Sequence, residues 1–181
     1  MAFIVIAVAV GIPIIFLYVV RALDLYASGG FRPVLFSLGW GLIAFFLSLQ
    51  VNTFAVPYVG YALIPILVAP IVEELFKSII LLYYFRHPDF KYFVDESIYG
   101  FAAGIGFAVA ENLLYLNRVG VAGGLILAVS RAFSTSLMHG SASALVGVAL
   151  GRFRFGKGRN RLASLVLGWG AAMALHIALI I

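Results

Sequence analysis

Two adjacent glutamates and a lysine interrupt an otherwise apolar stretch of the chain. The segment reads Pro70-Ile-Val-Glu73-Glu74-Leu-Phe-Lys77, so the three charged side chains lie within about one helical turn of one another. A carboxylate can take a proton from water, and a neighbouring charge adjusts its proton affinity. Pro65 and Pro70 precede the glutamates, and each removes a backbone donor and favours a kink. The segment therefore has the residue types of a general acid–base site.

Four further ionisable side chains lie in later apolar stretches: Glu111, Arg131, His139 and His176. A charge at the middle of a bilayer costs about 2.5 to 3.5 kcal/mol on insertion scales, so such groups must face one another or a wet cavity. Glu111 has no basic neighbour within a helical turn. Its partner must come from another helix, with Arg131 or a histidine as the obvious choice.

The positions of these residues along their segments agree. Glu73, Glu111, His139 and His176 each lie about 13 to 15 residues from a charged residue that flanks their apolar run, which is about 20 Å along a helix. Four segments thus bring polar groups to one level, which predicts a shared site. The alternative is a set of unrelated buried pairs that lock the helices together, such as Glu73 with Lys77 at i, i+4 spacing.

The fifth apolar run carries a stripe of polar residues. Arg131, Thr135, His139 and Ser143 recur every fourth residue, which predicts that they share one helix face. Serine and histidine in one membrane protein also suggest a serine protease of the rhomboid kind. Ser141 and Ser143 have no flanking nucleophile motif, and serine in membrane helices usually bonds backbone or a neighbouring helix, so this alternative is disfavoured.

The composition is that of a membrane protein. Of 181 residues, 64% are hydrophobic and 10% charged, against about 45–50% apolar and 25% charged in soluble domains. This nearly excludes a soluble domain and makes the lipid bilayer its main solvent. The absence of cysteine excludes a disulfide scaffold, thiolate zinc ligands and a cysteine nucleophile. The net charge of +5 does not indicate nucleic-acid binding, because the basic residues flank apolar segments.

Six apolar runs are long enough to cross a bilayer, which takes about 20 residues. They occupy residues 3–20, 33–50, 59–85, 97–117, 122–151 and 162–181. None has the period-2 alternation of a membrane β-barrel strand. We therefore expect an all-α polytopic membrane helix bundle of about six transmembrane helices, forming a single integral membrane domain over residues 1–181.

The basic residues predict the orientation of the bundle. Nine of them lie in the connections after the first, third and fifth runs: Arg21, Arg32, Arg86, Lys91, Arg152, Arg154, Lys157, Arg159 and Arg161. The alternate connections hold only Arg118. By the positive-inside rule, both termini are extracytoplasmic. The first run then fits an uncleaved helix better than a signal peptide, in a multi-pass protein of the plasma (cell) membrane.

The ordered motifs resemble those of the PrsW family of intramembrane proteases, relatives of the CAAX prenyl endopeptidases. Glu73-Glu74-x-x-Lys77 matches the EExxK motif, Phe107-x-x-x-Glu111-Asn112 the FxxxEN motif, and His139 and His176 the two later helix histidines. The resemblance implies cleavage of membrane-anchored proteins, including anti-sigma factors, and puts Glu73, Glu74 and His139 first among the catalytic positions. One departure is Ile180, where related proteins often complete an HxxxN pattern; this puts an amide-assisted oxyanion site there in doubt.

Residues and resemblance together predict peptide hydrolysis in or near the membrane, with a glutamate of the adjacent pair taking a proton from the attacking water. In a metal-dependent version, Glu111, His139 and His176 form a zinc-binding set with a fourth position open for water. In a metal-free version, His139 polarises the carbonyl. The candidate catalytic residues are Glu73, Glu74, Glu111, His139 and His176, with Lys77, Phe107, Asn112 and Arg131 in supporting roles.

Two alternatives from other classes remain. Buried glutamate, lysine, arginine and histidine also form proton relays, so a small proton-coupled transporter fits the same residues. Transporters often carry internal repeats, and no second copy of the Pro65–Lys77 pattern occurs. A non-catalytic membrane scaffold, with the basic stretch 152–161 against anionic headgroups, is the other alternative.

Overall fold

The protein is a bundle of helices in a computed structural model that describes residues 2–24, 30–87, 93–119, 124–156 and 161–179. The elements in chain order are α1 (Ala2–Ala22), α2 (Phe31–Val59), the π-helical turn η1 (Ile64–Val68), α3 (Ala69–Phe85), α4 (Phe93–Val119), α5 (Gly124–Phe155) and α6 (Arg161–Leu179). No strand occurs in these described ranges. The expected all-α class is confirmed. Within the described part of the chain, five helices are long and apolar enough to cross a membrane: α1, α2, α4, α5 and α6.

The apolar run at 59–85 is not one continuous helix. Helix α2 continues through Asn52 and Thr53 to Val59, and the chain turns at Gly60, whose φ of +79° lies in a region that glycine adopts without strain. The backbone N–H of Ala69 then bonds the carbonyl of Ile64, five residues earlier, which gives η1 before α3 begins. Helix α3 has 17 residues, fewer than the roughly 20 that a full crossing takes.

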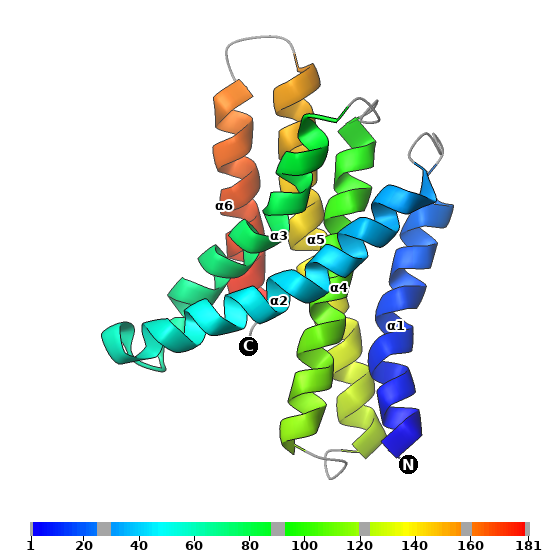
Figure 1. Cartoon of the computed structure of the whole chain (residues 1–181), viewed down its shortest axis with the longest axis vertical. Coiled ribbons are helices and arrows are strands. Elements are labelled where there is room, and N and C mark those ends of the chain that lie inside the picture. Colours follow the sequence, from blue (N-terminus) through cyan, green and yellow to red (C-terminus); the bar gives the residue numbers. More distant parts are fainter. Residues whose placement is uncertain (1, 25–29, 88–92, 120–123, 157–160, 180–181) are drawn as a thin grey trace.

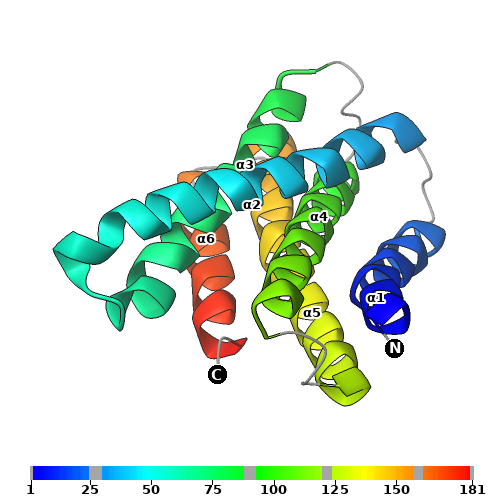
Figure 2. The same cartoon turned by 60° about the horizontal axis from the view of Figure 1, so that its bottom comes forward.

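Helix α2 lies obliquely across α3 and α4, as Figures 1 and 2 both show. With α3 it forms a helical hairpin, whose turn lies on the opposite side of the bundle from α1 (Figure 1). Trp40 of α2 joins the two arms by donating from Nε1 to the carbonyl of Phe76 at 2.8 Å. This bond fixes α2 beside the part of α3 that carries the two glutamates.

Helix α4 occupies the centre of the bundle and is largely buried. Its contact with α5 depends on glycine, because a Cβ on Gly100 would meet the carbonyl of Ser143, and one on Gly104 would meet the carbonyl of His139. Small residues of this kind let helix backbones approach closely in membranes. The Gly104 contact therefore sets the depth at which His139 is held.

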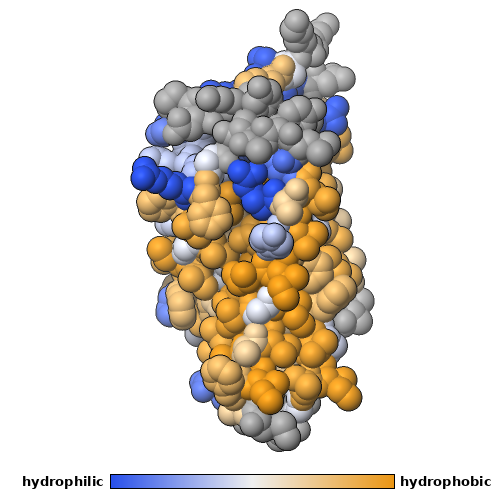
Figure 3. Space-filling model, turned by 90° about the vertical axis from the view of Figure 1, so that its right-hand side faces the viewer, coloured by the Kyte–Doolittle hydropathy of each residue, from blue (hydrophilic) through white to orange (hydrophobic). Residues whose placement is uncertain are grey.

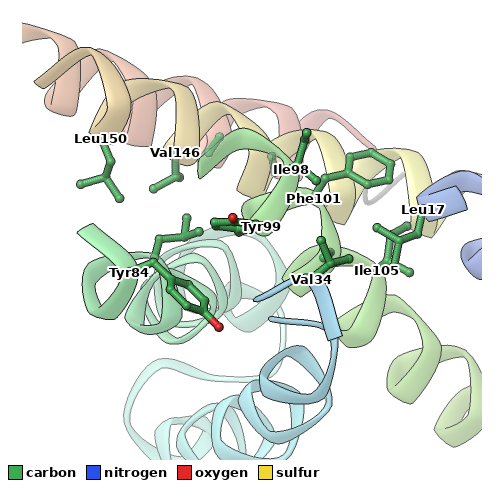
Figure 4. Close-up of a cluster of buried hydrophobic side chains, with 13 residues drawn as sticks. Leu17, Val34, Tyr84, Ile98, Tyr99, Phe101, Ile105, Val146 and Leu150 are labelled. Atoms are coloured by element: carbon green, nitrogen blue, oxygen red, sulfur yellow. The ribbon is translucent and has the colours of Figure 1, made fainter. Parts of the chain in front are cut away.

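A cluster of buried aliphatic and aromatic side chains packs the end of α3 against α4 and α5 (Figure 4). The rings of Tyr84 and Tyr99 lie 5.1 Å apart between α3 and α4, and Val146 and Leu150 contribute from α5. Apolar burial of this kind is the main source of packing energy. It holds α3 so that its glutamates face α5 and α6.

The surface and the helix ends fit a membrane environment. Apolar side chains cover most of the face in Figure 3, and hydrophilic ones gather near its upper end. Arg21 at the end of α1, Arg86 after α3 and Arg152 near the end of α5 all lie at the end of the bundle drawn uppermost in Figure 1. Basic residues of three connections thus share one end of the bundle, and the side of the membrane that this end faces stays a prediction. Lys91, Lys157 and Arg159 lie outside the described residues, as does Ile180.

Candidate active site

Glu74 is completely buried and surrounded by polar partners. Its carboxylate forms an ion pair with Lys77, whose side chain is equally buried. Ser143 of α5 donates to Oε2 at 3.2 Å, and Nδ1 of His176 of α6 lies 3.2 Å from Oε1. A carboxylate in a low-dielectric interior requires partners of this kind. Both oxygens of Glu74 are therefore engaged, and the residue joins α3 to α5 and α6.

Glu73 has a different environment although it is the next residue. Its side chain is 13% exposed, and its Oε2 lies 3.5 Å from Nε2 of His176. Asn52 of α2 donates from Nδ2 to Oε1 at 3.2 Å. Adjacent helical residues point about 100° apart, which is why the two glutamates meet different neighbours. Of the pair, Glu73 is the more accessible to a water or a substrate.

His139 has both ring nitrogens engaged. Nζ of Lys77 lies 3.1 Å from Nδ1, and Oε2 of Glu111 lies 2.9 Å from Nε2. A lysine ammonium can only donate, so Nδ1 accepts, and the ring proton of neutral His139 sits on Nε2 and is donated to Glu111. Lys77 and Glu111 together therefore select one tautomer and fix the orientation of the imidazole.

Glu111 finds its partners on another helix, as the sequence predicted. Besides His139, Arg131 of α5 donates from Nη2 to Oε1 at 2.8 Å. The guanidinium of Arg131 also lies over the ring of Tyr115, with its carbon 4.0 Å from the ring centroid. Arg131 thus orients Glu111, which in turn orients His139.

The supporting residues Phe107 and Asn112 contact neighbours of the carboxylates and not the carboxylates themselves. The Phe107 ring packs on His139 with centroids 4.7 Å apart, and the Lys77 ammonium lies 4.8 Å from the Phe107 centroid. The Oδ1 of Asn112 lies 3.1 Å from Oγ1 of Thr135 of α5. Asn112 therefore contributes a contact between α4 and α5.

The five candidate catalytic residues form one connected group. The rings of His139 and His176 lie 5.0 Å apart at 80° to each other. Contacts then run from Glu73 through His176, Glu74, Lys77 and His139 to Glu111 and Arg131. Helices α3, α4, α5 and α6 each contribute, so the polar groups that the sequence placed at one level do meet. The four members of the α5 stripe all bond residues of this group or its support.

Comparison with known proteins gives the family. A family model described as PrsW family intramembrane metalloprotease matches residues 30–178. The chain belongs to the PrsW family.

Relatives named Protease PrsW agree with this assignment. The chain is 32% identical over 108 residues to that of Bacillus subtilis (strain 168), covering 58% of this chain and 46% of the relative. It is 32% identical over 105 residues to the Protease PrsW of Halalkalibacterium halodurans, again covering 58% of this chain and 46% of the relative. It is 29% identical over 94 residues to the Protease PrsW of Geobacillus kaustophilus, covering 51% of this chain and 40% of the relative. The matches thus span less than half the length of these relatives. No solved structure matches the chain significantly.

The metalloprotease description of the PrsW family raises the question of which side chains could hold a metal. In the described part of the chain, ligand atoms of Glu73, His139 and His176 lie within 4.8 Å of one another. The sequence-based set had Glu111 in place of Glu73; Glu111 instead lies on the far ring nitrogen of His139, against Arg131. Two imidazoles and a carboxylate are usual zinc ligands, and histidine ligands usually have a carboxylate on the other ring nitrogen. The donor types therefore suit a zinc-type ion. Because Nε2 of His139 is bonded to Glu111 and Nδ1 accepts from the Lys77 ammonium, His139 can bind an ion through Nδ1 only when Lys77 moves away from it.

Asn52 is a residue of the PrsW site that the sequence analysis missed. The second predicted run ends at residue 50, which leaves Asn52 in a connection, whereas the structure places it on α2 beside Glu73. Its Oδ1 is buried and has no partner among the described residues. The available signal was the pair of amides Gln50 and Asn52 in a stretch that continues as an apolar helix.

Proposed function

We propose that this PrsW-family chain is an intramembrane endopeptidase that hydrolyses peptide bonds of membrane-anchored proteins in the plasma membrane. The observation that carries the proposal is the connected group of glutamates and histidines from four helices, buried in a membrane bundle. Polar groups of this number are costly in a bilayer unless they serve a function. Family membership supports the same conclusion.

Within the group, Glu73 is the proposed general base. It is the partly exposed member of the pair, whereas both oxygens of Glu74 already have partners. Glu73 takes a proton from water as the water oxygen forms a bond to the substrate carbonyl carbon. The proton then passes to the leaving amine as the carbon–nitrogen bond breaks. Asn52 holds Glu73 in place for both steps.

The two histidines surround the same space. Nδ1 of His176 faces Glu74, so this nitrogen donates and leaves Nε2 directed at Glu73. His139 is oriented by Lys77 and Glu111. In the metal-dependent version, Glu73, His139 and His176 would instead hold the ion, so Glu73 would be a ligand and not the free base. The ion would then supply Lewis-acid polarisation of the scissile carbonyl and would lower the pKa of the attacking water. In the metal-free version, the Lys77 ammonium supplies the positive charge near the developing oxyanion, because both ring nitrogens of neutral His139 already have partners.

The substrate class follows from the location of the group. A peptide bond reaches it only if its chain lies in or beside the membrane, so we expect a protein anchored by a transmembrane segment. An anti-sigma factor is the kind of substrate that the family resemblance suggests.

The test compares new protein amino termini in the membrane proteomes of cells that express wild type, Glu73→Gln or Glu74→Gln at matched levels. New termini in or beside other proteins' membrane spans, present with wild type and absent with Glu73→Gln, are the expected result. Glu96→Gln is the matched control, because Glu96 is a buried glutamate of α4 outside the connected group, and this variant should retain the new termini.

Equal folding is checked by yield and by monodisperse elution in detergent. An identical set of termini in wild type and Glu73→Gln, with both folded, would contradict the protease assignment. Proton flux in vesicles carrying wild type, lost in the same variant, would then favour the transporter.

A further inference from the structure

A cavity of about 780 Å³ lies between the first half of α2 and the end of α3. Its walls come from residues 30–43 and 80–87, and none of the glutamates or histidines of the site lines it. Trp40 lines the cavity and bonds the carbonyl of Phe76. The indole therefore lies between the cavity and the turn of α3 that carries Lys77.

The size and walls of the cavity fit a ligand with a long apolar part. Small-molecule sites usually have volumes of about 300 to 1,000 Å³ and are mostly apolar, with a few polar groups that orient the ligand. Here Leu35, Phe36 and Ile43 of α2 face Ile80 of α3 across the cavity. Leu35, Phe36 and Ile43 are exposed, so no other described helix covers them.

Polar residues of the cavity lie at one end of these helices. Arg32 is near the start of α2, and Tyr83 and His87 are at the end of α3. Both helix ends belong to the basic end of the bundle, where Arg21 and Arg86 also lie. Tyrosine and tryptophan with a basic residue are typical of the depth at which lipid headgroups meet the hydrocarbon.

We propose that this cavity is a binding site for an anionic phospholipid. The phosphate lies against Arg32, and an acyl chain extends along Leu35, Gly39 and Ile43. The charge and polarity of the cavity are complementary to those of an anionic phospholipid, because the cationic end of the cavity at the basic side of the bundle continues into an apolar slot. Basic residues at this depth attract anionic headgroups. The cavity is separate from the proposed catalytic residues, because none of them lines it.

Gly39 gives a way to fill the cavity without disturbing the helices. It lines the cavity, and a Cβ added to it would meet no atom within 4 Å. Gly39→Leu therefore places a side chain where the acyl chain would lie. Gly11 of α1 is equally open and does not line the cavity, so Gly11→Leu is the matched control.

The experiment measures retained lipid by native mass spectrometry after wild type and variants are exchanged through nanodiscs of phosphatidylglycerol or phosphatidylcholine. Wild type should retain phosphatidylglycerol at least about five-fold better than phosphatidylcholine, and Arg32→Gln should remove that preference, as expected for one basic contact. Gly39→Leu should lose both lipids, and Gly11→Leu should match wild type.

Equal retention of the two lipids by wild type, or retention by Gly39→Leu at the wild-type level, would overturn the proposal. A hydrophobic transmembrane peptide that occupies the cavity in place of either lipid would also overturn it. Arg32 is exposed, so Arg32→Gln keeps the test decisive if Gly39→Leu fails to fold. The readout is bound lipid, so the result does not depend on whether the chain proves to be a protease.

Discussion

Replacing Lys77 by methionine should destabilise the protein more than any surface change. Lys77 and Glu74 form an ion pair in which both side chains are fully buried. Unit charges about 4 Å apart interact by about 4 kcal/mol at an effective dielectric of 20. Removing one partner of a buried pair typically costs about 3 to 5 kcal/mol, because the other charge is left uncompensated. Lys77→Met leaves Glu74 with only Ser143 and His176.

A double-mutant cycle separates the ion pair from packing. Glu74→Gln alone leaves the Lys77 ammonium buried without a carboxylate, against the His139 nitrogen and the Phe107 ring. The double variant Glu74→Gln/Lys77→Met leaves neither charge, so it should cost several kcal/mol less than the sum of the single changes. The control Arg86→Gln, at an exposed position, should change the free energy of unfolding by less than about 0.5 kcal/mol.

The assay is reversible unfolding by sodium dodecyl sulfate in mixed micelles, followed by helical circular dichroism and by the fluorescence of the two tryptophans. If the single changes prove additive to within about 0.5 kcal/mol, Lys77 and Glu74 do not form a coupled pair, and the electrostatic account of the site is wrong.

Three further outcomes are expected. His176→Ala should abolish stoichiometric zinc binding in protein purified with added metal. Glu111→Gln changes a partner of His139 and not a ligand, so it should weaken zinc binding by about 10- to 100-fold. Equal zinc content in both variants and in wild type would refute the ligand set. Gly104→Val should prevent close packing of α4 on α5 and lower the yield of folded protein, as measured by size-exclusion chromatography. Asn52→Ala should lower the rate of substrate cleavage about ten-fold at unchanged stability, and its neighbour Thr53→Ala should not, because the Thr53 hydroxyl bonds only its own helix in the described structure.

The convergence of the site could be predicted because membrane burial makes charge costly. Glu111, His139 and His176 lie on different helices, yet each had to find polar partners, and the depth argument placed them at one level. The partner of Glu111 was named from the same reasoning as Arg131 or a histidine, and the structure shows both Arg131 and His139 bonded to it. The free-energy cost of burying a charge in the membrane and the rise of a helix per residue are sufficient to predict that these side chains meet.

The finer assignments could not be made from the sequence. Which carboxylate joins the two histidines depends on how α3 is rotated against α5 and α6, and tertiary packing alone determines that rotation. The structure brings Glu73 to the histidines and leaves Glu111 behind His139. The end of α2 was equally hidden, because Gly60 and the π-helical turn interrupt a run whose composition is continuous.

Helix α2 belongs to the site although none of the recognised motifs includes one of its residues. It contacts α3 through two hydrogen bonds, from Trp40 to the carbonyl of Phe76 and from Asn52 to Glu73. Their acceptors lie about one helical turn apart on α3. These two contacts fix both the position of α2 along α3 and the side chain of the proposed base. The matched family region, residues 30–178, begins at the residue before α2 and leaves out α1, which supplies none of the site contacts in the described structure. The proposed chemistry therefore rests on α2 through α6, with the oblique helix α2 holding the more accessible glutamate of the adjacent pair in place.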